Sequence, residues 1–313
     1  MQIFKESTHI DFMGKRKQAI VFSLLLIVFS IGALLTRGLN FGLDFTGGTL
    51  IEAGFTQPVD LHELRGALEK AGFADAVVQH FGTSQDVLVR LAPRGGEATE
   101  ALGDEILQAL NSASKGEVQM RRQEYVGPQV GGELRDDGGL AMIIALAFIL
   151  VYVMARFEYR FALGSIAALI HDVIITLGFF ALFQFEFDLT TLAAVLAVIG
   201  YSLNDTIVVF DRIRENFRKM RKDSPLLVVN ASINQTLSRT LMTSGTTLLV
   251  VFAMFLLGGE LIHSFSLALL VGIVVGTYSS IYVASAVALA LKITSTSLMP
   301  VKKEGAEQTD QEY

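Results

Sequence analysis

Six long apolar segments dominate this chain and decide which folds are open to it. Each segment is close to the roughly 20 residues that an α-helix needs to cross the hydrocarbon core of a bilayer. Of the 313 residues, 18% are charged, whereas an ordinary soluble domain carries about 25%. A soluble enzyme, a secreted scaffold and a disordered chain are therefore excluded. We predict a polytopic α-helical membrane protein with helices at residues 18–35, 140–155, 161–183, 189–210, 240–259 and 264–291.

The first apolar segment follows the basic cluster Lys15, Arg16 and Lys17, as the core of a signal peptide does. It is longer than the roughly 7–15 residues of a cleavable signal core, and no clear cleavage site follows it. We therefore expect an uncleaved membrane anchor.

Charge is concentrated in one hydrophilic segment. Residues 37–138 contain 9 basic and 16 acidic residues, a net charge of −7, while the whole chain has a net charge of −6. This acidity argues against nucleic acid as a partner. The chain has no cysteine, so disulfides, zinc–thiolate sites and thiol catalysis are excluded.

Basic residues in the short connections predict the topology, because loops rich in Lys and Arg stay in the cytoplasm. The N-terminus, the turn at 156–160, the loop at 211–239 and the tail are basic, whereas the connections at 184–188 and 260–263 contain no Lys or Arg. Both termini are therefore expected in the cytoplasm and residues 37–138 outside. The predicted regions are a cytoplasmic N-terminus (1–17), helix one (18–36), an outer domain (37–138), helices two to six (139–292) with a cytoplasmic loop at 211–237, and a cytoplasmic tail (293–313).

The sequence pattern of the outer segment predicts a small α+β domain. Short apolar or alternating stretches at 50–55, 76–81, 87–91 and 117–126 predict four strands. Apolar residues at helical spacing predict one helix around 61–71 and another around 101–110. The order β-α-β-β-α-β is that of a ferredoxin-like domain, which by itself indicates no activity.

Asp205 and Arg239 are the leading candidates for function. A charge inside hydrocarbon costs at least about 2.5 kcal/mol, so ionisable residues in apolar segments mark functional sites by default. Asp205 lies inside the fourth apolar segment and Arg239 at the start of the fifth. Antiparallel neighbours would place Arg239 within reach of Asp205. The alternatives are a packing role for Asp205, satisfied by a neighbour such as Asn204, and a topological role for Arg239.

His171 and Asp172 lie near the middle of the third apolar segment and are secondary candidates. Adjacent helical residues point about 100° apart, so we expect them to face different partners. One would line the bundle and the other would make a structural hydrogen bond.

Glycine patterns suggest structure and not ligand binding. The run from Gly42 to Gly48 matches no phosphate-binding fingerprint, and we interpret Asp44, Gly47 and Gly48 as a turn or hinge leading into a strand. Gly272 and Gly276 form a small-xxx-small pair, which is typical of close helix packing. Residues 212–222 alternate basic and apolar side chains, and we interpret them as an amphipathic surface helix.

Several stretches together resemble the SecF family, the smaller half of the bacterial SecD–SecF pair within the resistance-nodulation-division superfamily. They are GLDFTGGT at 42–49, HDVIIT at 171–176, VIGYSLNDTIVVFDRIREN at 198–216, TLSRTLMTSGTT at 236–247 and GTYSSIYVAS at 276–285. The combination in this order is highly specific. The rest of the outer domain and the tail match only in general character, and no site is carried onto them.

The resemblance implies a non-enzymatic subunit of the bacterial inner membrane that pairs with SecD and assists the SecYEG channel. It implies that the proton gradient drives the movement of unfolded polypeptides out of the membrane, with protons as the coupling ion and no other cofactor or metal. Asp205 and Arg239 match the family positions linked to proton movement.

Two other functions stay open at this point. One is half of a proton-coupled efflux permease for small molecules. The other, a more distant alternative, is an intramembrane aspartyl protease using Asp172 and Asp205, which would need carboxyls about 3 Å apart.

Overall fold

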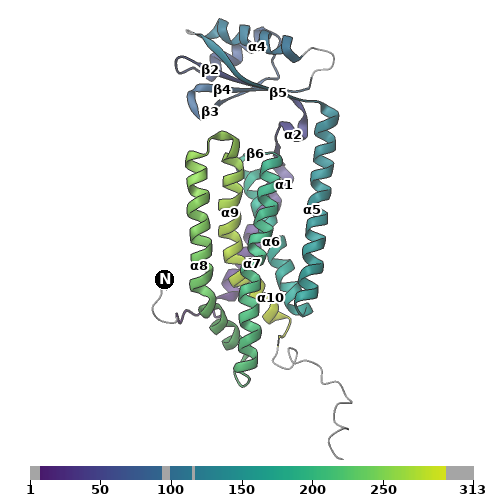
Figure 1. Cartoon of the computed structure of the whole chain (residues 1–313), viewed down its shortest axis with the longest axis vertical. Helices are drawn as coiled ribbons and strands as arrows, with labels where there is room; N and C mark the ends of the chain where they lie inside the picture. The colour runs from purple at the N-terminus through teal and green to yellow at the C-terminus, as the bar shows by residue number, and fades with distance from the viewer. Residues whose placement is uncertain (1–7, 94–98, 115–116, 294–313) are drawn as a thin grey trace, which may run out of the picture.

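Six helices long and apolar enough to cross a membrane form a bundle in the computed structural model, which describes residues 8–93, 99–114 and 117–293 (Figure 1). The chain is thus a multi-pass membrane protein, and the predicted tail at 293–313 lies almost wholly outside the described residues. The first five spans are α1 (Arg16–Arg37), α5 (Pro128–Arg156), α6 (Tyr159–Phe183), α7 (Leu189–Lys219) and α8 (Pro225–Leu257). The last span is divided into α9 (His263–Ser279), a π-helical turn η2 (Ser280–Ala284) and α10 (Ser285–Ala290), after a short η1 (Glu260–Ile262).

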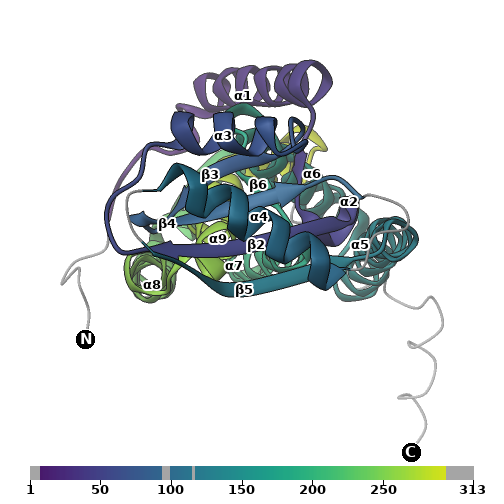
Figure 2. The same cartoon turned by 90° about the horizontal axis from the view of Figure 1, so that it is seen from above.

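The hydrophilic segment folds into a separate layer at one end of the bundle (Figure 1). Its elements follow the predicted order: β2 (Gly48–Phe55), α3 (Leu61–Lys70), β3 (Val77–Phe81), β4 (Thr83–Leu91), α4 (Thr99–Ala113) and β5 (Val118–Val126). The sheet order is β3-β4-β2-β5, with every neighbouring pair antiparallel. Seen from above, α3 and α4 lie across the sheet, on the face that points away from the bundle (Figure 2).

Strand alternation gives this sheet two different faces. Ile51 and Ala53 of β2 and Val87 and Val89 of β4 are fully buried beneath α3 and α4. The opposite face carries polar side chains such as Glu52 toward the bundle. A cavity of about 630 Å³ lies between that face and the ends of the helices. A space lined by both polar and apolar side chains therefore separates the sheet from the bundle.

The glycine-rich run joins the outer domain to the bundle. It begins with β1 (Asn40–Phe41), which pairs in parallel with β6 (Glu186–Phe187) between α6 and α7. The predicted turn contains a single helical turn, α2 (Leu43–Thr46), and then Gly47 and Gly48 at φ +68° and +125°. A Cβ on Gly48 would lie 2.2 Å from the carbonyl oxygen of Leu91, so the reversal needs glycine both for its backbone angle and for its space.

Asp44 adds a second link at this junction. Its carboxylate accepts a hydrogen bond of 3.1 Å from the backbone N–H of Leu189, the first residue of α7. A carboxylate at a helix N-terminus satisfies an unpaired N–H group and interacts favourably with the helix dipole. The turn predicted around Asp44 is therefore also a connection to α7.

At the other end of the bundle, α7 and α8 run on beyond their apolar parts (Figure 1). Most of the cytoplasmic loop predicted at 211–237 is helical, since only residues 220–224 separate the two helices. The amphipathic helix predicted at 212–222 is helical up to Lys219, but it continues α7 and packs its apolar face on the bundle. Ile213 and Phe217 are buried in the bundle core, and Asn216 donates hydrogen bonds of 2.8 and 2.9 Å to side chains of α8. These contacts stabilise a helical hairpin.

Gly272 and Gly276 bring α9 against α7, as their spacing predicted. A Cβ on Gly272 would lie 2.2 Å from Val198, and one on Gly276 would lie 2.9 Å from the Cβ of Ser202. Small residues let two helix backbones approach closely in a membrane. This close contact places the polar residues of α7 and α9 beside one another.

Candidate functional site

Asp205 of α7 is buried between α7, α8 and α9, with 2% of its surface exposed. The Ser244 hydroxyl of α8 donates a hydrogen bond of 3.3 Å to its Oδ2. Ser244 Oγ also lies 2.8 Å from Thr277 Oγ1 of α9, and either of these hydroxyls can donate to the other. A line of hydroxyl groups therefore leads from the carboxyl to α9.

The sequence of α8 explains why Ser244 faces inward. Thr236, Thr240 and Ser244 recur at four-residue spacing and are all buried, which places them on one stripe of the helix. The Oγ1 of Thr240 has no hydrogen-bond partner among the described residues. The face of α8 that packs on α7 is thus lined with small hydroxyl side chains.

Arg239 does not contact Asp205 in this structure. It lies next to that stripe, its side chain is exposed, and within the described residues it forms no ion pair. Arg239 is five residues before Ser244, about 7.5 Å along the helix axis. The two leading candidates are therefore on neighbouring helices, as predicted. Among the described residues the guanidinium acts on the carboxyl through longer-range electrostatics and not through a hydrogen bond or ion pair.

Asn204 is exposed and contributes nothing to this site. Asn204 itself is not the polar neighbour that satisfies Asp205, because its exposed side chain and the buried side chain of Asp205 point to different sides of α7. The hydroxyl partner comes from α8 instead.

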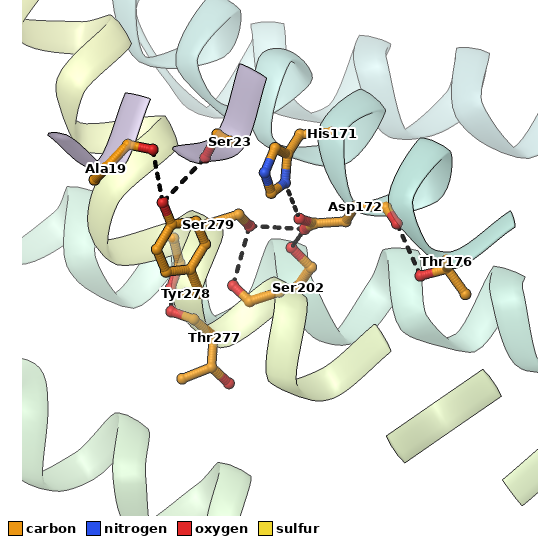
Figure 3. A network of polar contacts seen from close by, with 11 residues as sticks. Ala19, Ser23, His171, Asp172, Thr176, Ser202, Thr277, Tyr278 and Ser279 are labelled. Carbon is orange, nitrogen blue, oxygen red and sulfur yellow. Dashed lines mark hydrogen bonds and ion pairs between the residues drawn. The ribbon is translucent and has the colours of Figure 1, made fainter. Parts of the chain in front are cut away.

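His171 and Asp172 form a second polar cluster, shown in Figure 3. Both are buried, and His171 Nδ1 lies 2.9 Å from Asp172 Oδ1. Asp172 Oδ2 accepts hydrogen bonds from Ser202 of α7 and from Ser279 of α9, the latter at 2.7 Å. The two residues face different partners, as predicted, but they also bond to each other.

The imidazole of His171 lies on the other side of the cluster. It stacks on Tyr278 of α9, with ring centroids 6.1 Å apart. The Tyr278 hydroxyl donates a hydrogen bond of 2.8 Å to the carbonyl of Ala19 and lies 3.1 Å from Ser23 Oγ, both on α1. His171 Nε2 has no hydrogen-bond partner among the described residues.

Sequence reasoning missed the hydroxyl residues of both clusters. Ser202, Ser244, Thr277 and Ser279 are Ser or Thr side chains in largely apolar helices, where such residues commonly bond to their own backbone. The available signal was their position: Ser202 is one turn from Asp205 on α7, and the α8 hydroxyls repeat every four residues. In the described part of the chain, no group of three or more His, Cys, Asp or Glu side chains could hold a metal ion.

Comparisons with protein families agree on one assignment. The family model of the C-terminal region of the protein export membrane proteins SecD and SecF matches residues 106–294, and that of the SecD/SecF GG motif matches residues 32–59. The chain is 58% identical to the protein translocase subunit SecF of Vibrio alginolyticus, covering 98% of each chain. It is 53% identical to the protein translocase subunit SecF of Pseudomonas aeruginosa, covering 93% of this chain and 94% of that one.

Solved structures show the same relationship. The crystal structure of SecDF, a translocon-associated membrane protein from Thermus thermophilus, matches with a TM-score of 0.83 and 41% identity. The match covers 93% of this chain and 40% of the SecDF chain, so this chain corresponds to less than half of that protein. A super-membrane-facing form of SecDF matches with a TM-score of 0.69.

Proposed function

Because the chain belongs to the SecD/SecF family of protein export membrane proteins and is an accessory subunit of Sec-dependent translocation, we propose that it couples this work to the proton gradient. One charge crossing a potential of 100 mV yields about 2.3 kcal/mol, which is enough to bias a conformational equilibrium. The observation that carries the proposal is Asp205: a buried carboxyl held by the neutral hydroxyl of Ser244.

This setting suits a carboxyl that gains and loses a proton. Burial without a bonded cation disfavours the charged form, while the Ser244 hydroxyl can donate to the carboxylate or accept from the carboxylic acid. The hydrogen bond between Ser244 and Asp205 can therefore be kept in both protonation states, with only its direction reversed. The hydroxyls of Ser244 and Thr277 then pass the change in hydrogen bonding on to α9.

Arg239 acts as a movable charge in this proposal. In the present conformation its exposed side chain forms no close ion pair with Asp205 among the described residues. A conformation that brings the guanidinium toward Asp205 favours proton release, and its withdrawal favours proton uptake. Arginine stays charged at all relevant pH values, so Arg239 gates the proton and does not carry it.

The partner in the membrane is SecD, and the complex serves the SecYEG channel. Two observations support SecD: the match to SecDF covers only 40% of that longer chain, and large apolar surfaces of α1, α5 and α8 are exposed in the isolated subunit. The protein resides in the bacterial inner membrane with both termini in the cytoplasm, because the basic residues gather at the α7–α8 end of the bundle.

The ferredoxin-like outer domain then lies in the periplasm, where it receives exported polypeptide in an extended form. Strands β3 and β5 are the edges of the sheet, and an extended chain can add to such an edge through backbone hydrogen bonds. Val77 of β3 and Tyr125 of β5 are exposed on these strands and offer apolar contacts to side chains of the passing polypeptide.

The two other functions find no support. The curated relatives are protein translocase subunits and not small-molecule permeases. An aspartyl protease needs two carboxyls sharing a proton. Asp172 and Asp205 each bond to a separate set of hydroxyls, and no hydrogen bond joins them within the described residues.

Export by reconstituted vesicles tests the proposed function. Vesicles containing the channel, SecD and this chain should export more of a reporter protein when a proton gradient is present, and a protonophore should remove the gain. Vesicles without this chain should show no such gain. Equal stimulation with and without the chain would contradict the proposal.

A further inference from the structure

A second buried carboxyl lies in the bundle, and the proposed function does not use it. Asp172 of α6 has no exposed surface, and its two oxygens contact three side chains from three helices (Figure 3): His171, Ser202 and Ser279. Ser202 is three residues before Asp205 on α7, so the two carboxyl sites are about one helical turn apart along that helix.

Asp172 has no permanent cation to balance its charge. The apolar stretches of α1, α5, α7, α9 and α10, which surround it, contain no Lys or Arg and only one acidic residue, Asp205. The other titratable side chains on these elements near the pair are Tyr278, which stacks on His171, Tyr282 beside Tyr278, and Tyr201 of α7. A buried carboxylate in hydrocarbon ordinarily pairs with a cation or takes up a proton.

The geometry points to a second proton-binding site, formed by His171 and Asp172 together with the hydroxyls of Ser202 and Ser279. The ligand is a single proton, which binds to the carboxyl of Asp172 or to Nε2 of His171. The site is distinct from Asp205, whose hydroxyl partner is on α8.

The serine hydroxyls fit both protonation states of Asp172. When Asp172 is charged, Ser202 and Ser279 donate to Oδ2. When Asp172 is protonated, its new O–H group donates to a serine oxygen. Ser279 can then turn its hydrogen toward the carbonyl of Gly276, which is 3.1 Å away. Uptake of one proton thus forms one O–H bond and leaves both serine hydroxyls and both oxygens of Asp172 with hydrogen-bond partners.

His171 provides the second place for the proton. With hydrogen on Nδ1 it donates to Asp172, and Nε2 then carries a free lone pair in a buried position. A proton on Nε2 converts the pair from a lone carboxylate to a neutral ion pair. Serine-hydrolase chemistry is excluded, since both serines contact the carboxyl and neither contacts the imidazole.

The site is also placed to move α9. Ser279 directly precedes the π-helical turn at Ser280–Ala284, and such turns are found frequently at functional sites. Protonation of Asp172 replaces a charge-assisted hydrogen bond from Ser279 with a weaker neutral one, which loosens α9 from α6. Thr277 on the same helix contacts the Asp205 site through Ser244. The connection from Thr277 through Ser244 to Asp205 rests on the proposed function, whereas the proton site at Asp172 does not.

Infrared spectroscopy of the purified full chain with its membrane partner, titrated from high to low pH, tests the inference directly. The carbonyl band of protonated carboxyls should contain one buried component that disappears in Asp172→Asn and another that disappears in Asp205→Asn. Asp211→Asn should keep both components, because Asp211 is a partly exposed residue that pairs with Arg156.

A milder pair of variants covers the case in which Asp172→Asn fails to fold. Ser279→Ala and Ser202→Ala each remove one donor to the charged carboxylate, so the Asp172 component should appear at about tenfold lower proton concentration. Infrared titrations in which Asp172→Asn removes neither a carboxyl component nor the protonation bands of the His171 imidazole, or which both serine variants leave unchanged, would overturn the inference. The same experiment records the component that depends on Asp205. If that is the only buried component found, the second site is rejected and the proposed function stands.

Discussion

Ser244 of α8 donates a hydrogen bond of 3.3 Å to Asp205 of α7, so the group that bonds to this buried carboxyl is a neutral hydroxyl. A hydroxyl serves either protonation state of a carboxyl, whereas a bonded guanidinium would favour the charged state strongly. The relationship between Ser244 and Asp205 therefore leaves the carboxyl free to titrate when the surroundings change.

Two replacements of Arg239 distinguish the effect of its positive charge from the effect of its planar guanidinium group. Arg239→Met should reduce the stimulation of export by a proton gradient, and Arg239→Lys should reduce it less, because lysine keeps the charge without the planar guanidinium. Export of a reporter in energised vesicles is the measurement. Lys222→Met, which removes an exposed cation from the α7–α8 connection, is the control and should leave stimulation normal. If Arg239→Met and Lys222→Met lost the same amount of gradient-stimulated export, the loss would follow from removing any basic residue and not from a specific role of Arg239.

The contact between α7 and α9 should be sensitive to one methyl group. Gly272→Ala places a Cβ 2.2 Å from Val198 and should destabilise the protein by about 1–3 kcal/mol. Gly200→Ala, on an open face of α7, should be neutral or should stabilise by up to about 1 kcal/mol. Thermal unfolding of the purified variants in detergent measures both. A Gly272→Ala protein as stable as Gly200→Ala would show that the helices are not in close contact there.

Glu186, between α6 and α7, should make the stability of the folded protein depend on pH. Burial raises the pKa of its carboxyl and Asp188 adds to this, while Arg90 of β4, which forms an ion pair with it, lowers the pKa in part. A carboxyl with a raised folded-state pKa contributes stability that is complete below its unfolded pKa and is lost as pH rises through the folded value.

Glu186→Gln should therefore gain melting temperature over the natural protein as pH rises from acidic to neutral. Arg90→Met should instead lose stability most at neutral pH, since it leaves the ionised carboxyl without its cation. Melting temperatures across this pH range are the readout. A difference between Glu186→Gln and the natural protein that stays constant with pH would contradict the assignment.

Single cysteines test the topology, since the chain has none of its own. Ser84→Cys, in the outer domain, should react with an impermeant thiol reagent added to the periplasmic side of intact cells. Lys222→Cys, an exposed residue of the α7–α8 connection, should react only after the membrane is opened. The opposite pattern would invert the orientation and with it the direction of proton flow.

The fold was largely predictable because membrane helices and strands have strong local signals. Apolar length gave all six spans, and period-two alternation gave the strands of the outer domain. The ends of α7 and α8 were not predictable in this way, because the basic residues from Arg212 to Lys219 resemble a cytoplasmic loop. Asn216, Ile213 and Phe217 keep that stretch helical through contacts with α8 and the bundle core, which only the tertiary structure provides.

The site was predictable in its carboxyls and not in their partners. Asp205 and Asp172 stand out in the sequence because charge in an apolar segment is rare. The partners Ser244 and Ser279 do not stand out, since the rotation of α8 and α9 decides which hydroxyls face inward. The π-helical turn after Ser279 also has no glycine or proline to mark it, so the sequence offers no local sign of it.

The central claim is that Asp205 binds and releases the coupling proton. The most direct measurement is reporter export in energised vesicles containing Asp205→Asn, with and without a protonophore. We predict that Asp205→Asn assembles normally but loses the protonophore-sensitive stimulation, and that Asp205→Glu keeps part of it because a titrating group remains.

Asp211→Asn is the matched control on the same helix and should behave like the natural protein, because its carboxylate is partly exposed and paired with Arg156. Stimulation of normal size with Asp205→Asn, abolished by the protonophore as in the natural protein, would contradict the account and leave Asp205 with a packing role.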